Sequence, residues 1–364
     1  MRIRSAIAIV ILGCLTIVWT SFSNVARADA IQLPEKTGSF DIPAQEWPIQ
    51  PGSRTVRMFV HYPGGKLENV SDKTGLMLSL HNWGGVYAVG TADPQLLADR
   101  YNVVAICVNY LQSGQEPIKR PEPYDFGYLQ ALDVLRALHT VYDGLPRQGR
   151  TFDKGRIFCT GGSGGGNVTL MANKLAPRTF ACIVPLCGMS RLSDDVAYDL
   201  PGGSRLNAKY SRDPKNPYYL SPDAQLIRDV SHPPHLRVMR QLGNSAKIIL
   251  IHGESDDVCP ISDARTLVVR LQDEKFDLVP RIITIRDLDR KTYTSTGHLL
   301  GDRSLIVFRE ADKFLKSDSP AAVRRQGVTD FDLRDEKVRY LTPHGSFVIS
   351  YATGYPVGRF EAAK

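Results

Sequence analysis

The chain has 364 residues, is 43% hydrophobic and 23% charged, and carries a formal net charge of +7. These proportions are typical of a globular protein, which excludes a disordered or fibrous chain, and the length allows one large domain or two small ones. The small basic excess is not gathered into patches interleaved with aromatic residues, so we expect no nucleic-acid partner.

Residues 1–28 have the layout of a secretory signal peptide. The basic start MRIR is followed by a nearly continuous apolar run from Ser5 to Thr20 and then by small residues suited to cleavage. An uncleaved anchor is the alternative, but the run is slightly short for the ~30 Å hydrocarbon core of a bilayer. Lipid attachment at Cys14 fits less well, because the apolar run continues past it. We therefore expect export to the periplasm or the cell exterior, with no stable membrane span after cleavage.

Five cysteines lie beyond the expected signal peptide, none of them in a CxxC pair. Without such pairs, neither a structural zinc site nor a thiol redox motif is expected. Because export implies an oxidising compartment, a disulfide is conceivable, and Cys187 and Cys259 are the candidates since each follows an apolar run. The remaining thiols, Cys107, Cys159 and Cys182, lie within apolar runs and are expected to be buried.

Short apolar runs alternate with helical patterns after residues 31–53, which are Pro-rich and predicted to be irregular. The predicted strands cover 55–62, 75–80, 102–110, 155–160, 180–186, 247–251 and 279–285. The predicted helices cover 94–101, 124–142, 167–175, 261–272 and 302–315. Strands that are apolar at nearly every position and alternate with helices predict an α/β fold, with a mostly parallel central sheet and helices on both faces.

Two segments interrupt this alternation. Residues 188–246 are long and polar, and an insertion of this kind between two core strands predicts a cap or lid. Residues 317–364 open polar and then become β-like, with a hairpin expected where 338–341 and 346–351 flank a Pro-His-Gly turn. We interpret this C-terminal β extension as a structural addition, with substrate binding by its aromatic residues as the alternative.

The sharpest motif is Gly161-x-Ser163-x-Gly165, between a predicted strand and a predicted helix. A serine at such a tight turn stands clear of the sheet, and its neighbours must be small because strand and helix approach closely there. The N–H of Gly164 then lies at the helix N-terminus, where partial positive charge stabilises an oxyanion. The alternative is a glycine-rich turn that only packs or binds phosphate, but the lysine of a phosphate-binding loop is missing. We therefore predict that Ser163 is a nucleophile.

Two later segments carry the partners that a nucleophilic serine needs. The strand at 247–251 leads into a loop with Asp256 and Asp257, and a carboxylate at the carboxyl end of a parallel strand faces the crevice where such sheets place their sites. His298 follows the last predicted strand of the sheet. A lone histidine is more often structural, but the order Ser163, Asp256, His298, each after a separate strand, favours a catalytic triad.

A further loop, His81-Asn82-Trp83-Gly84-Gly85, follows the predicted strand at 75–80. Acyl transfer needs two backbone N–H groups that converge on the oxyanion, one from the residue after the nucleophile and one from a loop in this position. Asn82 or Trp83 is expected to supply the second, and the sequence leaves both open. His81 is expected to orient the loop rather than to act as a base.

Together these motifs resemble the α/β-hydrolase superfamily, and within it the prolyl-oligopeptidase-like and esterase branch. The resemblance covers residues 55–316 and rests on HNWGG, GGSGG, HGESDDVCP and TGH. It implies an α/β-hydrolase fold for a catalytic domain at 29–316, and the match of His252-Gly253-x-x-Asp256 to the acid loop of that branch favours Asp256 over Asp257. The oxyanion loop, the long segment at 188–246 and the tail depart from the usual pattern.

The expected function is that of a secreted serine hydrolase, in the first place a carboxylic-ester hydrolase that acts on a small-molecule or polymer-linked ester through an acyl-enzyme. A serine peptidase of the prolyl oligopeptidase type is the alternative, although those enzymes carry a large β-propeller gate and only a short stretch precedes the first predicted strand here. An inactive binding protein of the same fold is the third hypothesis. No metal and no organic cofactor is expected.

Overall fold

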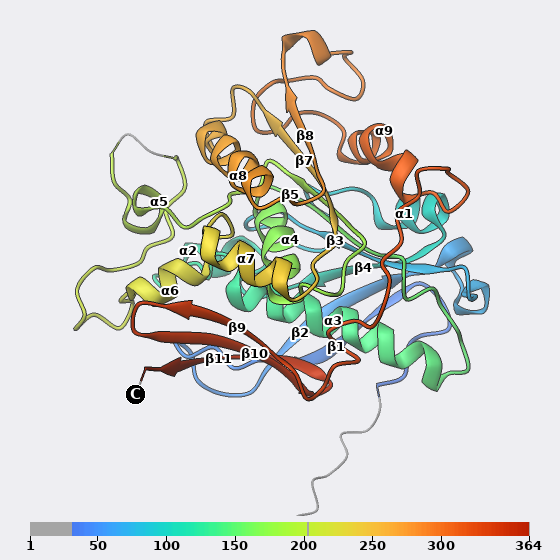
Figure 1. Cartoon of the computed structure of the whole chain (residues 1–364), viewed down its shortest axis with the longest axis horizontal. Coiled ribbons are helices and arrows are strands. Elements are labelled where there is room, and N and C mark those ends of the chain that lie inside the picture. Colours follow the sequence, from blue (N-terminus) through green and yellow to red (C-terminus); the bar gives the residue numbers. More distant parts are fainter. Residues whose placement is uncertain (1–30, 202–203, 364) are drawn as a thin grey trace, which may run out of the picture. The chain divides into compact units, whose positions relative to one another are not determined.

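A computed structural model describes residues 31–201 and 204–363. The expected signal peptide lies outside the described residues, so export stays a prediction. Eight strands form one sheet in the order β1-β2-β4-β3-β5-β6-β7-β8 (Figure 1). Their bounds are β1 Gly38–Ala44, β2 Arg54–His61, β3 Gly75–Leu80, β4 Val103–Asn109, β5 Ile157–Gly162, β6 Cys182–Leu186, β7 Lys247–Gly253 and β8 Leu278–Ile283. Neighbours from β4 to β8 pair in parallel, whereas β2 pairs antiparallel with both β1 and β4.

Helices cover both faces of this sheet, as expected. They are α1 Pro94–Tyr101, α2 Gln115–Lys119, α3 Tyr128–Arg147, α4 Gly164–Leu175, α8 Ile261–Asp273 and α9 Arg303–Leu315, and single 3-10 turns lie at Pro63–Gly65, Leu67–Asn69 and Ile285–Asp287. Successive residues of β7 separate the two cores: Ile248 packs in the core with α3, α4 and α8, whereas Ile249 packs in the core with α1 and α9. A strand buried on both sides must be apolar at every position, which explains the continuous apolar runs. The predicted α/β-hydrolase fold is confirmed.

The prediction of irregular structure at 31–53 is wrong, because β1 lies there. This strand pairs with the edge of β2, and its Ile42 is fully buried opposite Val56. It contains Pro43 and polar residues, a composition that an edge strand tolerates because one row of its backbone groups faces away from the sheet. The composition that made the segment resemble a loop is therefore that of an edge strand.

The helix predicted to begin at residue 124 begins four residues later, at Tyr128. Phe126 and Gly127 have φ angles of 57° and 99°, which are incompatible with a helix. The side chain of Asp125 then accepts hydrogen bonds from the N–H groups of Leu129 and Gln130 at 2.7 and 3.1 Å. Residues 124–127 therefore form a loop that is fixed against the first turn of α3.

The segment 188–246 has two halves with different surroundings. It contains the short helices α5 Asp194–Tyr198, α6 Pro222–Ile227 and α7 Pro233–Gln241. Its first half, up to Leu220, forms a small apolar cluster with Tyr124 and Phe126. Its second half packs into the main core, where α6 and α7 contact the C-terminal strand β9. The first half therefore packs its apolar side chains against the loop before α3, whereas the second half reaches that loop through the ion pair of Arg228 with Asp125 at 2.9 Å.

The C-terminal residues form a separate three-stranded antiparallel sheet. The expected hairpin is present as β9 Lys337–Thr342 and β10 Gly345–Thr353, and β11 Tyr355–Ala362 adds a third strand that was not predicted. The sheet lies along α3, α6 and α7 (Figure 1). A side chain at Gly358 would approach the hydroxyl of Tyr128 to 2.4 Å, so a glycine is required where β11 meets α3. The same glycine interrupts the strand pattern and hides β11 in the sequence.

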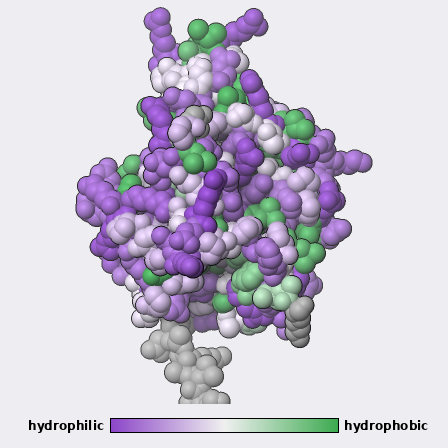
Figure 2. All heavy atoms as spheres, turned by 90° about the vertical axis from the view of Figure 1, so that its left-hand side faces the viewer, coloured by the Kyte–Doolittle hydropathy of each residue, from purple (hydrophilic) through white to green (hydrophobic). Residues whose placement is uncertain are grey.

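The face of the molecule in Figure 2 is predominantly hydrophilic, and its hydrophobic residues form small, separate groups. Within residues 31–201 and 204–363, no helix has both the length and the hydropathy that crossing a bilayer requires.

Candidate active site

The turn between β5 and α4 holds Ser163 in a conformation that few residues adopt. Its φ and ψ angles are 56° and −116°, a strained combination that persists only where the surroundings enforce it. A side chain at Gly161 would approach the carbonyl oxygen of Gly165 to 2.4 Å, and one at Gly165 would approach that of Leu80 to 2.1 Å. The glycines of GGSGG are therefore a steric requirement of the turn that presents Ser163.

Three side chains from the carboxyl ends of different strands meet at this turn. The Nε2 atom of His298 lies 2.8 Å from Ser163 Oγ. Its Nδ1 atom lies 3.0 and 2.9 Å from the two carboxylate oxygens of Asp256. A proton on Nδ1 satisfies the carboxylate and leaves Nε2 free to accept the serine proton, which is the arrangement of a serine–histidine–aspartate triad. We refer to Ser163, Asp256 and His298 as the triad.

Asp256 is almost fully buried, with 3% of its surface exposed. Burial raises the pKa of its carboxyl group, but hydrogen bonds with His252 and His298 outweigh this effect and hold the pKa of Asp256 well below its usual range. The N–H groups of Val258 and Cys259 also donate to its Oδ1, at 3.0 and 2.9 Å. The carboxylate is therefore ionised and fixed in position.

His252 is a buried residue that contacts the acid of the triad, a role that the sequence analysis did not predict. It is buried, and its Nε2 lies 2.7 Å from the carbonyl oxygen of Cys259 and 3.2 Å from Asp256 Oδ2. The carbonyl can only accept, so Nε2 carries a proton and points toward the acid loop. The spacing His252-Gly253-x-x-Asp256 could have indicated this contact, because it places His252 at the end of β7, four residues before Asp256.

The alternative acid, Asp257, has different surroundings. Its side chain is 70% exposed and pairs with Arg205 at 2.6 Å. The structure therefore brings Asp256, and not its neighbour, to His298.

The loop after β3 places a free backbone donor beside the nucleophile. The N–H of Asn82 donates to the carbonyl oxygen of Val89 at 3.0 Å and is already used. The N–H of Trp83 has no acceptor among the residues that the structure describes, and a side chain at Gly164 would lie 2.6 Å from this nitrogen. Gly164 opens α4, where backbone N–H groups lack helical acceptors. Of Asn82 and Trp83, only Trp83 has a backbone N–H that can act together with the N–H of Gly164 as a second oxyanion donor.

His81 lies beneath this loop. Its Nδ1 donates to the carbonyl oxygen of Asn82 at 2.7 Å, its Nε2 lies 2.6 Å from Ser113 Oγ, and its ring stacks on Tyr110 at 3.9 Å. Burial lowers the pKa of His81 to about 4, so the ring is neutral near pH 7. These contacts suit a residue that holds the loop.

Apolar and aromatic side chains surround the space next to Ser163. We call the following residues the pocket wall: Trp83, Tyr124, Phe126, Met189 and Leu206. The Trp83 and Tyr124 rings stack at 3.9 Å with an angle of 8° between their planes. The enclosed space is only about 10 Å³, close to the volume that a single water occupies. The sequence prediction missed Tyr124 and Phe126, because it placed them in a helix.

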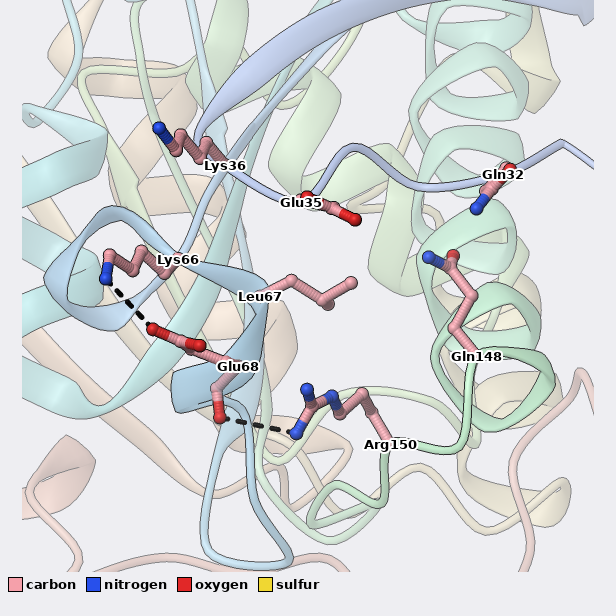
Figure 3. A pocket seen from close by; sticks show the side chains of 8 residues that line it. All are labelled: Gln32, Glu35, Lys36, Lys66, Leu67, Glu68, Gln148 and Arg150. Carbon is pink, nitrogen blue, oxygen red and sulfur yellow. Dashed lines mark hydrogen bonds and ion pairs between the residues drawn. The ribbon is translucent and has the colours of Figure 1, made fainter.

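A larger depression of about 560 Å³ lies elsewhere, between residues 32–36, residues 66–68 and the end of α3 (Figure 3). Its lining is polar, and Lys66 pairs with Glu68 at 3.0 Å within it. No triad residue lines it. Its size alone therefore does not connect it with the triad.

Cys187, His252 and Asp256 offer donor atoms within 4.8 Å of one another, as a metal site would. Burial raises the pKa of the Cys187 thiol to about 12, whereas a thiol must be deprotonated to bind a metal, and Asp256 is occupied by His298. We therefore interpret this cluster as part of the surroundings of the triad and not as a metal site. The disulfide considered between Cys187 and Cys259 is not formed, and both are free, buried thiols next to the triad.

The model of the prolyl oligopeptidase family (peptidase S9) matches residues 135–318, a range that contains the whole triad. No curated protein sequence matches the chain. Among solved structures, an acylaminoacyl peptidase from Pyrococcus horikoshii superimposes with a TM-score of 0.51 at 15% identity, over 76% of this chain and 40% of that one. A putative dipeptidyl aminopeptidase IV from Bacteroides ovatus superimposes with a TM-score of 0.50 at 12% identity, over 77% and 36%. At these identities the likeness concerns the fold, and the chain spans 40% or less of either structure's length.

Proposed function

The chain belongs to the prolyl oligopeptidase family of serine hydrolases, and on this basis we propose that it is a serine peptidase that hydrolyses peptide bonds. The observation that carries the proposal is that the family match contains all three triad residues and that hydrogen bonds of 2.8 to 3.0 Å join them. Peptide hydrolysis by such a triad needs a nucleophile, a base that becomes an acid, and a fixed carboxylate.

In the proposed mechanism, Ser163 Oγ attacks the carbonyl carbon of the scissile bond while its proton passes to His298 Nε2. The imidazolium that forms is stabilised by Asp256 on its other side. The tetrahedral intermediate then collapses, and His298 returns the proton to the leaving amine. Water repeats the sequence on the acyl-enzyme and releases the acid.

The N–H groups of Gly164 and Trp83 are proposed to stabilise the oxyanion of this intermediate. Support comes from the free N–H of Trp83 beside Gly164 and from the position of Gly164 at the start of α4. The pocket wall next to Ser163 would contact the substrate on the acyl side of the scissile bond. Trp83 would therefore have two roles: its backbone N–H would stabilise the oxyanion, and its side chain would contact the substrate.

Ester hydrolysis, the first expectation from sequence, is the second candidate. The same triad can cleave esters, because ester and peptide hydrolysis proceed through the same acyl-enzyme. The family favours the peptidase, because the branch that matches residues 135–318 is defined by peptidases.

Two measurements on the purified protein test the proposal. A fluorophosphonate probe should label the wild type and fail to label Ser163→Ala, whose kcat should fall by about 10⁴- to 10⁶-fold. An unlabelled wild type would favour the inactive binding protein and reject the enzyme. A panel of peptide amides and short-chain nitrophenyl esters then separates the two candidates: ester turnover without any amide turnover rejects the peptidase.

A further inference from the structure

Arg303, at the start of α9, contacts two parts of the candidate active site. Its Nη2 donates to the backbone carbonyl oxygen of His298 at 3.0 Å. Its Nε lies 3.4 Å from the position that a side chain at Gly162 would occupy, one residue before the nucleophile. One guanidinium group therefore lies between the loop that carries the base and the strand that carries Ser163.

The local surroundings of this cation are otherwise unfavourable. Nη1 is buried and has no hydrogen-bond partner among the described residues, and no carboxylate of that part of the chain pairs with the guanidinium. An unpaired donor away from water costs free energy. The side chain also lies in the first turn of α9, where the helix dipole disfavours a positive charge. Neither ion pairing nor helix stability thus accounts for an arginine here.

The guanidinium lies near the buried side of the triad. Burial raises the pKa of the Cys187 thiol, and the nearby charge of Arg303 opposes that rise. The same holds for Cys259, whose pKa burial raises well above its usual value. Both thiols border Asp256.

We propose that Arg303 is a positioning residue for His298, an assignment that rests on the proposed function. Its hydrogen bond holds the His298 backbone and so keeps the imidazole within reach of Ser163 Oγ. Asp256 holds the other side of the ring through Nδ1, and the buried thiols of Cys187 and Cys259 lie beside that carboxylate.

The test compares Arg303→Met, which removes the hydrogen bond and the charge, with Arg303→Lys, which keeps the charge. Misplacement of a catalytic group by about 1 Å can cost roughly 10²-fold in rate, so Arg303→Met should lower kcat by about 10- to 100-fold with KM within about twofold of wild type. Arg303→Lys keeps a charged donor near the same carbonyl oxygen and should recover part of kcat.

Arg309→Met is the matched control, because Arg309 lies on the same helix, is partly exposed and pairs with Asp289 at 2.7 Å. It should leave kcat and KM unchanged. Melting temperatures of all variants separate misfolding from a local effect. A folded Arg303→Met protein with wild-type kcat overturns the inference.

An NMR measurement of the proton on His298 Nδ1 keeps this test separate from that of the proposed function. If the wild type proves unreactive toward fluorophosphonate, the proposed function fails, but this resonance still reports on Arg303. Because the proton lies in the hydrogen bond to Asp256, its resonance should shift or broaden in Arg303→Met and stay unchanged in Arg309→Met. An unchanged resonance in Arg303→Met rejects the positioning role.

Discussion

The triad and the pocket wall lie next to each other but are built in different ways. Ser163 and Asp256 closely follow β5 and β7, and His298 lies in the loop after β8, so the strand order of the sheet brings the three residues to one edge. The pocket wall comes from the loop after β3, the loop before α3 and the first half of 188–246. The chemistry thus depends on strand order and tight turns, whereas the fit to a substrate depends on side chains of separate loops.

Substitution of Asp256 should produce the largest effect in this comparison. In Asp256→Asn the amide can no longer stabilise the imidazolium and can stabilise the wrong tautomer of His298, so kcat should fall by about 10⁴-fold. Steady-state kinetics on the best peptide or ester substrate measures the loss.

Asp257→Asn is the control for the same loop, because Asp257 is exposed and pairs only with Arg205. Its kcat should stay within about twofold of wild type, since exposed pairs contribute little. Equal losses in the two variants would show that the triad was assigned to the wrong carboxylate.

Substitution in the pocket wall should change selectivity more than chemistry. Tyr124→Ala removes the ring that stacks on Trp83 and enlarges the space beside Ser163. Preference should move toward bulkier acyl groups by about 10- to 100-fold in relative kcat/KM, the scale of one or two methylene groups in an apolar pocket. The ratio of kcat/KM for a large and a small acyl substrate gives the readout.

Tyr219→Ala serves as its control, because Tyr219 belongs to the same half of 188–246 but is 37% exposed and lies outside the pocket wall. It should leave the ratio unchanged. If Tyr124→Ala also leaves the ratio unchanged, the acyl group binds elsewhere.

The smallest effect is expected from substitution of the residue through which α4 contacts the segment 188–246. Lys174, near the end of the helix that starts after Ser163, is fully buried and donates to the carbonyl oxygens of Ile227 and Asp229 at 2.8 and 2.7 Å. Burial lowers its pKa from 10.5 to about 7, against the opposing attraction of Asp229. The folded state therefore binds fewer protons than the unfolded state between these values, and the free energy of unfolding should rise with pH across this window.

Lys174→Met should flatten this pH dependence. Urea unfolding at pH 7 and at pH 9.5 measures the difference in slope between variant and wild type. A variant with the same slope as wild type would mean that Lys174 is not the group responsible.

Much of the candidate site was readable in the linear chain because its determinants are local. The glycines around Ser163 are needed by a turn of a few residues, and strands buried on both faces must be apolar wherever they occur. The alternation of such strands with helices predicted the parallel sheet, and the sheet brings the ends of its strands to one edge. Ser163, Asp256 and His298 could therefore be named before their distances were known.

The remaining features depend on contacts between segments far apart in the chain. The N–H of Asn82 is used by Val89 and that of Trp83 is not, which only the folded loop decides. The segment of β1 was predicted to be irregular and that of β11 was not assigned to a strand, and both become strands because neighbouring strands supply their hydrogen bonds. Arg303 has no local motif, since its role depends on where α9 packs. Local geometry is encoded by adjacent residues, whereas long-range packing is settled by which surfaces meet when the chain folds.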